Sequence, residues 1–297
     1  MPFALGKILV AIDGSVYSDY ALNVAIKIAE KYSSHIALLH VKLPATSAVA
    51  VSGPIMDPIL GTSPMLVPAP NEKPREPIDI LEARKSLVAE RNITVNSELI
   101  ESVDVGGEIL KRGGSGGYDL IVLGSRGLSG LRSFFLGSVS LKVAKEAKCS
   151  VLVVKNRIEN VPKIILGYDG SEESRKALEC AKDLARKFRA HLTVLSIVNI
   201  PVSGDGYILT SVDRWEKETR QLVDEAVSAA KSEGIDVDGK VTEHTDISRA
   251  ITDEAERGGY EIIVVGSRGR GRLRSLFLGS VASGVANTSK TNVFIVR

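Results

Sequence analysis

The sequence contains few cysteines and no long apolar run. Its two cysteines, Cys149 and Cys180, are not spaced as metal ligands, which argues against a structural zinc site or a disulfide framework and suits a reducing cytosol. No apolar stretch approaches the roughly twenty residues of a membrane-spanning helix. Residues 1–7 also lack the basic-then-apolar order of a signal peptide. We therefore expect a cytoplasmic protein without a membrane partner.

The chain also has almost no excess of one charge sign, and it has few aromatic residues. Lysine and arginine number 38 against 36 aspartate and glutamate residues, so the formal net charge is +2. Aromatic residues make up 5% of the chain, and Trp215 is the single tryptophan. Proteins that bind single-stranded nucleic acid combine a broad basic face with aromatic stacking residues. We therefore expect no nucleic-acid partner.

Two well-known nucleotide-binding patterns are missing. No G-x-x-x-x-G-K-[ST] sequence occurs, so the lysine that contacts the terminal phosphates in P-loop proteins has no counterpart. The glycines at 124–130 and 266–271 also fail the G-x-G-x-x-G pattern of dinucleotide-binding folds. These absences exclude a P-loop site and disfavour NAD.

The chain does contain an internal repeat. Gly124-Ser-Arg-Gly127 is followed after nine residues by Gly137-Ser138, and Gly266-Ser-Arg-Gly269 is followed after nine residues by Gly279-Ser280. Each copy follows an apolar, β-branched run, so its glycines fall where a strand ends and backbone can approach a ligand. One G-x-x-G is also typical of an ordinary strand-to-helix turn. Two copies with identical spacing favour a duplicated nucleotide phosphate site.

The repeat divides the chain into two domains. Asp13 and Asp169 correspond at an offset of 156 residues, whereas Gly124 and Gly266 correspond at 142. The first half therefore carries additional residues between these points. A chain of 297 residues is long enough for two domains of about 150 residues. We predict a first domain over 1–156 and a second over 157–297.

The additional residues of the first half lie in a proline-rich insertion over 44–77. Six prolines stand between Pro44 and Pro77, a density that no helix or central strand tolerates. The insertion is either a lid over the first site, because proline-fixed loops order at a lower entropic cost, or a surface loop.

Five apolar runs of strand type occur in each half, with segments of helical spacing between them. Strands that are apolar on consecutive residues and alternate with helices predict a parallel sheet covered on both faces, which is a doubly wound α/β fold. The runs are 7–12, 35–41, 93–99, 120–123 and 150–154, and then 163–168, 191–198, 236–243, 261–265 and 292–296.

Four serines stand where helices are expected to begin. Ser15 and Ser171 precede the first helix of each half, and Ser138 and Ser280 precede the last. All four suit the capping of exposed amide groups, which requires no ligand. At Gly137 and Gly279 a ligand is the stronger interpretation, because a helix N-terminus offers unpaired N–H groups and glycine lets an anionic oxygen come close.

The duplicated motif resembles that of the universal stress protein family, in its ATP-binding branch and in a tandem two-domain form. That family's motif is G-x-x-G, nine residues, G-[ST], and both halves match it. The resemblance implies flavodoxin-like or Rossmann-like domains with five parallel strands in the order 3-2-1-4-5. ATP would lie across the carboxyl ends of the first and fourth strands. It also implies that the last strands of the two halves pair antiparallel, as an intramolecular pseudo-dimer, and by analogy that tandem chains form a homodimer.

The same resemblance implies two sets of binding residues. In each set, an aspartate at the end of the first strand would lie near the adenine and ribose. An apolar strand residue would line the adenine pocket, and the motif residues would contact the ribose and phosphates. ATP could bring Mg²⁺ held by phosphate oxygens and water. The first set is Asp13, Val41, Gly124, Arg126, Gly127, Gly137, Ser138 and Val139, and the second is Asp169, Ile197, Gly266, Arg268, Gly269, Gly279, Ser280 and Val281.

Several of these residues have a purely structural alternative. Asp13 and Asp169 each precede a glycine and could close an Asp-Gly turn. Tyr168 replaces Ile12 and could either stack on the base or fill part of the second pocket. Residues 270–274 add three arginines, which we expect to be mostly a solvated loop. His35, His191 and His40 show no metal-ligand spacing, so we predict no metal site formed by the protein itself.

Binding rather than catalysis is the leading functional hypothesis. The motif supplies backbone donors and an arginine, but no general base can be identified, so no catalytic residue is assigned. We expect a nucleotide-dependent regulatory protein of the stress response with at most weak ATPase activity. The alternatives are a slow ATP-hydrolysing enzyme on the same fold and a scaffold with vestigial pockets.

Overall fold

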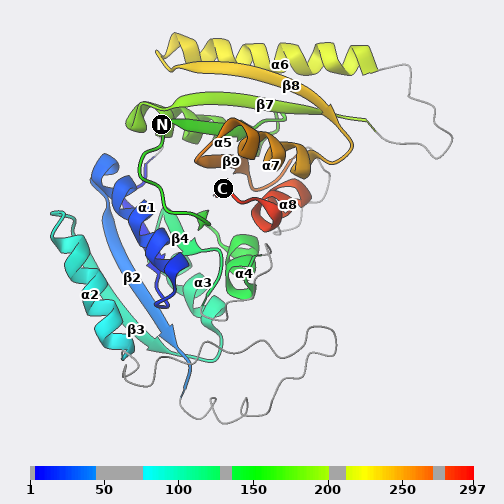
Figure 1. The fold of residues 1–297 in the computed structure, drawn as a ribbon. Coiled ribbons are helices and arrows are strands. Elements are labelled where there is room, and N and C mark those ends of the chain that lie inside the picture. Colours follow the sequence, from blue (N-terminus) through cyan, green and yellow to red (C-terminus); the bar gives the residue numbers. More distant parts are fainter. Residues whose placement is uncertain (1–3, 45–75, 128–135, 201–211, 270–277) are drawn as a thin grey trace, which may run out of the picture.

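The computed structural model describes residues 4–44, 76–127, 136–200, 212–269 and 278–297 (Figure 1). Most of the proline-rich insertion and the three arginines of 270–274 lie outside these ranges. The strands of the first half are β1 (Lys7–Ala11), β2 (His35–Lys42), β3 (Val95–Glu101), β4 (Leu120–Gly124) and β5 (Ser150–Val154). Those of the second half are β6 (Lys163–Gly167), β7 (His191–Asn199), β8 (Val237–His244), β9 (Ile262–Gly266) and β10 (Asn292–Val296).

All ten strands belong to one sheet. Their order is β3-β2-β1-β4-β5-β10-β9-β6-β7-β8. Each half therefore has the order 3-2-1-4-5, and all pairings within a half are parallel. This confirms the doubly wound α/β fold in two tandem copies. The third strand of the first half is Val95–Glu101 rather than the predicted 93–99, and its pairing with β2 begins with Val95 opposite Ile36.

The halves join through an antiparallel pairing of β5 with β10. Val153 lies opposite Val293, Leu152 opposite Phe294, and Val151 opposite Ile295. The antiparallel pairing that the family resemblance implies is therefore confirmed. It removes two apolar sheet edges that would otherwise be open to association with other chains.

Helices cover both faces of the sheet, as the alternating pattern predicts (Figure 1). One face is covered by α1 (Val16–Tyr32), α2 (Pro77–Ala89), α5 (Glu172–Phe188) and α6 (Val212–Ser232). The other face is covered by α3 (Val105–Ser115), α4 (Ser138–Glu146), α7 (Ile247–Gly258) and α8 (Ser280–Thr288). Within the described ranges, none of the helices combines the length and apolar character needed to span a membrane.

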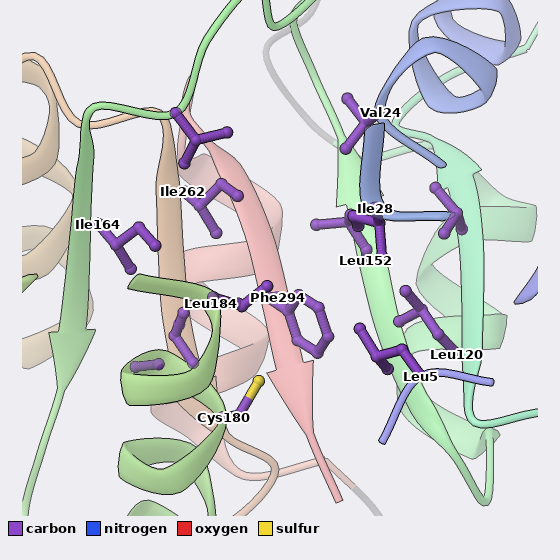
Figure 2. Packing of buried hydrophobic residues seen from close by; sticks show 14 of the residues in the cluster. Leu5, Val24, Ile28, Leu120, Leu152, Ile164, Cys180, Leu184, Ile262 and Phe294 are labelled. Atoms are coloured by element: carbon purple, nitrogen blue, oxygen red, sulfur yellow. The ribbon is translucent and has the colours of Figure 1, made fainter. Parts of the chain in front are cut away.

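A continuous apolar core crosses from one half to the other beneath α1 and α5. Figure 2 shows Ile28, Leu152, Cys180 and Phe294 among its side chains. Phe294 lies on the joining strand β10 and is fully buried. Burial of a phenylalanine side chain contributes about 2 kcal/mol, so the seam between the halves is stabilised by packing as well as by strand pairing.

The helix starts confirm two of the four capping predictions and correct the other two. Ser15 Oγ accepts a hydrogen bond from Ser18 N at 3.2 Å, and Ser171 Oγ accepts one from Ser174 N at 3.3 Å. At α4 and α8 the capping residue is the glycine, Gly137 or Gly279, and the following serine is the first helical residue. A glycine cap has no side chain to satisfy the first amide groups, so these groups are left for another acceptor.

Candidate functional site

A pocket opens at the carboxyl ends of β1 and β4, where the chain leaves the sheet in opposite directions. Its apolar wall comes from β1, β2 and α3, and its polar wall comes from the turns after β1 and β4 and from the start of α4. All eight residues predicted for the first site line it, namely Asp13, Val41, Gly124, Arg126, Gly127, Gly137, Ser138 and Val139. Residues from four segments far apart in the sequence therefore converge on one cavity.

The apolar wall includes residues that the sequence reasoning did not identify. Ala11 and Leu39 come from the strands, and Val105 and Ile109 come from α3. A planar apolar group fits such a wall because its burial removes apolar surface from water. The α3 residues carry no motif, and only the packing of this helix on the sheet brings them to the pocket.

Two glycines of the motif allow close packing inside the site. A Cβ at Gly124 would lie 2.7 Å from the backbone carbonyl carbon of Tyr17, at the start of α1. A Cβ at Gly127 would lie 2.8 Å from Asp13 Oδ2. Gly124 is thus required to seat α1 against the end of β4, whereas Gly127 leaves room beside the carboxylate. The repeated glycines therefore have a packing role as well as the ligand-approach role predicted for them.

Asp13 takes part in the Asp-Gly turn that was its structural alternative. Its Oδ1 accepts a hydrogen bond from Ser15 N at 2.9 Å, and Gly14 has a φ of +82°, which favours glycine. Its Oδ2 faces Gly127. One carboxylate oxygen therefore closes the turn while the carboxylate as a whole remains in the wall of the pocket.

Arg126 is held beside the pocket by an uncharged partner. Its Nη1 donates a hydrogen bond to Tyr17 Oη at 3.0 Å, and its guanidinium carbon lies 5.3 Å from the centroid of the Tyr17 ring. Its Nε is buried and has no hydrogen-bond partner among the described residues. Because tyrosine does not neutralise the guanidinium, the full positive charge remains available to an anion.

A second cation lies near Arg126. Lys155 follows β5 and is buried, and its ammonium donates a hydrogen bond to the carbonyl of Ala286 at 2.7 Å. Burial, and secondarily the charge of Arg126, lowers the pKa of Lys155 to about 8. Two cationic side chains, Arg126 and Lys155, therefore lie close together near the turn after β4.

His40 lies on the other face of β2, between the pocket residues Leu39 and Val41 in sequence. It is buried, and its Nδ1 has no hydrogen-bond partner among the described residues. Burial lowers its pKa, although the carboxylate of Asp13 acts in the opposite direction. His191 is the first residue of β7, at the strand end opposite the motif. Its Nδ1 lies 3.1 Å from Asp236 Oδ2, and its Nε2 lies 3.4 Å from Asp238 Oδ1.

The second half repeats the backbone arrangement of the first. A Cβ at Gly266 would lie 2.7 Å from the backbone carbonyl carbon of Glu173, and one at Gly269 would lie 2.8 Å from Asp169 Oδ2. Asp169 Oδ1 accepts hydrogen bonds from Ser171 N and Oγ at 3.0 and 2.6 Å. The other predicted residues lie on the equivalent elements, namely Ile197 on β7, Arg268 after β9, and Gly279, Ser280 and Val281 at the start of α8.

Tyr168 follows β6 at the position that Ile12, a residue of the first pocket, holds after β1. Its side chain is buried in the core cluster beneath α5 and α6. Ile197 and Val281 pack against the cluster on the opposite face of the sheet. Tyr168 therefore contributes to the core of the second half, as Ile12 does in the first half while also lining the pocket.

Comparison with known proteins identifies the family to which this fold belongs. The model of the universal stress protein family matches residues 5–155 and again residues 160–297. The chain belongs to the universal stress protein family. A universal stress protein of Mycolicibacterium smegmatis is 30% identical over 98% of this chain and 96% of its own length.

Other universal stress proteins match one half or the whole fold. The universal stress protein YxiE of Bacillus subtilis is 35% identical and spans 50% of this chain and 98% of its own length. The crystal structure of a universal stress protein from Archaeoglobus fulgidus covers 100% of this chain with 97% of its own, at a TM-score of 0.66 and 22% identity. The likeness to that structure shows the fold alone.

Proposed function

We propose that this universal stress protein binds ATP, or a related adenine nucleotide, at one site in each half and acts as a nucleotide-dependent regulator in the cytoplasm. The observation that carries the proposal is the convergence of all eight motif residues of the first half on one pocket. An apolar wall suits adenine, and a glycine-capped helix start beside an arginine suits phosphates. The corresponding domains are 1–156 and 157–297.

The residues present fit the phosphate chain of such a ligand. Gly137 caps α4 without a side chain, and a Cβ at this position would already lie 3.3 Å from the carbonyl oxygen of Ser125. Arg126 lines the pocket and adds positive charge there, and Lys155 lies close enough to Arg126 to feel its charge. Mg²⁺, when it accompanies the nucleotide, would be held by phosphate oxygens and water.

Binding rather than turnover is proposed because the residues around the pocket have identifiable roles in holding a ligand. Asp13 is engaged in its turn and Arg126 is engaged with Tyr17. Backbone groups and an arginine stabilise a bound phosphate chain, whereas hydrolysis also requires a positioned water and a base. A homodimer of tandem chains is proposed by analogy with other symmetric assemblies.

The test compares the wild-type chain with Gly137→Val. Isothermal titration with ATP and Mg²⁺ should show binding by the wild type and at least a tenfold weaker first site in the variant, because valine fills the space in front of the first amide groups of α4. Gly114→Val is the matched control, since nothing lies within 4 Å of a Cβ there. If the wild type shows no binding heat, the proposal is refuted. If the wild type releases phosphate from ATP over many turnovers and Gly137→Val abolishes this release, the protein is an ATP hydrolase rather than a nucleotide-binding regulator.

A further inference from the structure

The two halves share their backbone geometry but differ in the charge that surrounds the motif arginine. The glycines of both motifs make the same close approaches, at 2.7 Å for Gly124 and Gly266 and at 2.8 Å for Gly127 and Gly269. The backbone therefore makes the same close approaches in both motifs. The difference lies at the start of the first helix of each half.

In the first half, the residue of α1 that contacts the arginine is uncharged. Tyr17 accepts a hydrogen bond from Arg126 Nη1 at 3.0 Å and carries the guanidinium over its ring. Tyr20 packs edge-on against Tyr17, with ring centroids 6.1 Å apart and an interplanar angle of 84°. Among the described residues, Arg126 forms no ion pair. Its positive charge is thus not paired with a carboxylate of α1.

The second half places charged residues at the corresponding positions. Glu173 stands where the first half has Tyr17, and Lys176 stands where it has Tyr20. Glu173 Oε1 lies 3.5 Å from Arg268 Nη2, and its Oε2 lies 3.1 Å from Lys176 Nζ. Arg268 is therefore already paired with a carboxylate.

The position of Glu173 makes this pairing effective. Only 16% of its side chain is exposed, so solvent screens it less than an ordinary surface carboxylate. A phosphate that approached Arg268 would have to displace Glu173 or accept a negative charge beside it. Either route weakens binding in proportion to the charge of the ligand.

We infer that the two sites take ligands of different charge, with Glu173 as the specificity-determining residue. The first site binds the polyphosphate form of an adenine nucleotide. The second site discriminates against the triphosphate and accepts an adenine compound with little phosphate charge. This inference rests on the proposed function and deepens it by naming the ligand class of each half.

The experiment titrates the full chain with ATP, AMP and adenosine, and follows both binding heat and stoichiometry. For the wild type we expect one strong ATP site and a second site at least tenfold weaker. In Glu173→Gln the second site should gain about tenfold in ATP affinity, which corresponds to about 1.4 kcal/mol, while its affinity for adenosine stays the same. Tyr17→Glu should weaken ATP at the first site by a similar factor.

Glu172→Gln is the matched control for Glu173→Gln. It removes a neighbouring carboxylate that pairs with Lys176 at 3.1 Å but is not paired with Arg268. We expect it to leave the ATP affinity of the second site within a factor of two. A similar gain in ATP affinity in both glutamine variants would overturn the inference. The gain would then come from the lower negative charge of the surface as a whole and not from the contact between Glu173 and Arg268.

The remaining outcomes separate this inference from the proposal on which it rests. Two equal ATP sites in the wild type, unchanged in Glu173→Gln, would overturn the inference and leave nucleotide binding standing. No binding of any of the three ligands to any variant would overturn the proposed function itself. Thermal unfolding of each variant shows whether a loss of binding is caused by a loss of the folded structure.

Discussion

Lys155 and Arg297 hold equivalent positions in the two halves, and each donates a hydrogen bond to the end of a helix in the other half. Lys155 Nζ contacts the carbonyl of Ala286 on α8 at 2.7 Å, and Arg297 Nη2 contacts the carbonyl of Ala144 on α4 at 2.6 Å. Cations are favoured at the C-terminal ends of helices, where carbonyl groups lack partners. Because α4 and α8 begin at the motif glycines, each cation links one half to the helix that forms the candidate site of the other.

Lys155 gives this link a pH dependence. Its pKa is about 8 in the folded protein against an ordinary value of 10.5. Between these values the unfolded chain carries a proton that the folded chain has released, so the free energy of unfolding should rise with pH. From pH 8 to pH 10 we expect the wild type to gain about 2 kcal/mol relative to Lys155→Met, as measured by urea unfolding. Lys148→Met, at an exposed position, should follow the wild type, and parallel curves for the wild type and Lys155→Met would contradict the assignment.

The seam between β5 and β10 should not tolerate charge. Val153 is fully buried and lies opposite Val293, so Val153→Asp would bury an unpaired carboxylate or force it to remain protonated. We expect a loss of about 3 kcal/mol or more in unfolding free energy, and a single unfolding transition should separate into two as the halves uncouple. Val103→Asp is the control, since Val103 is 73% exposed. Equal stability of the two variants would count against the packed seam.

Much of this fold is predictable from the chain because the signals are local and occur twice. Consecutive apolar residues identify the strands, and their alternation with helical spacing gives the parallel sheet. The duplication gives two halves, and the family motif gives the strand order. The pairing of β5 with β10 could be expected because both are apolar edges, although only the resemblance indicated its antiparallel direction.

The charge environment of the candidate site was not predicted. Tyr17 and Glu173 are separated from Arg126 and Arg268 by about a hundred residues, and only the packing of α1 and α5 against the strand ends brings them together. Alignment of the two halves does place Tyr17 opposite Glu173, and this departure from symmetry was the available signal. The prediction that Ser138 and Ser280 cap their helices was wrong, because the preceding glycines, Gly137 and Gly279, already have the extended backbone of a cap.

Gly124 and Gly266 should be equally intolerant of a methyl group. In each case the added Cβ would lie 2.7 Å from backbone at the start of a helix, and backbone cannot move aside as the end of a flexible side chain can. We expect Gly124→Ala and Gly266→Ala each to lower the free energy of unfolding by about 1–3 kcal/mol. Gly114→Ala, with nothing within 4 Å of the new atom, should be neutral or slightly stabilising. Tolerance of alanine at either motif glycine would show that the helix start can shift.

The two cysteines should be unreactive in the folded protein. Burial raises the pKa of Cys149 to about 11 and raises that of the fully buried Cys180 well above its ordinary value. The thiolate is the reactive form, so at pH 8 a maleimide or disulfide reagent should modify the native chain far more slowly than the urea-unfolded chain. Cys149, which is only partly buried, should react first, and Cys149→Ala should remove that phase. Rapid reaction of both thiols in the native chain would mean that the core beneath α5 opens readily.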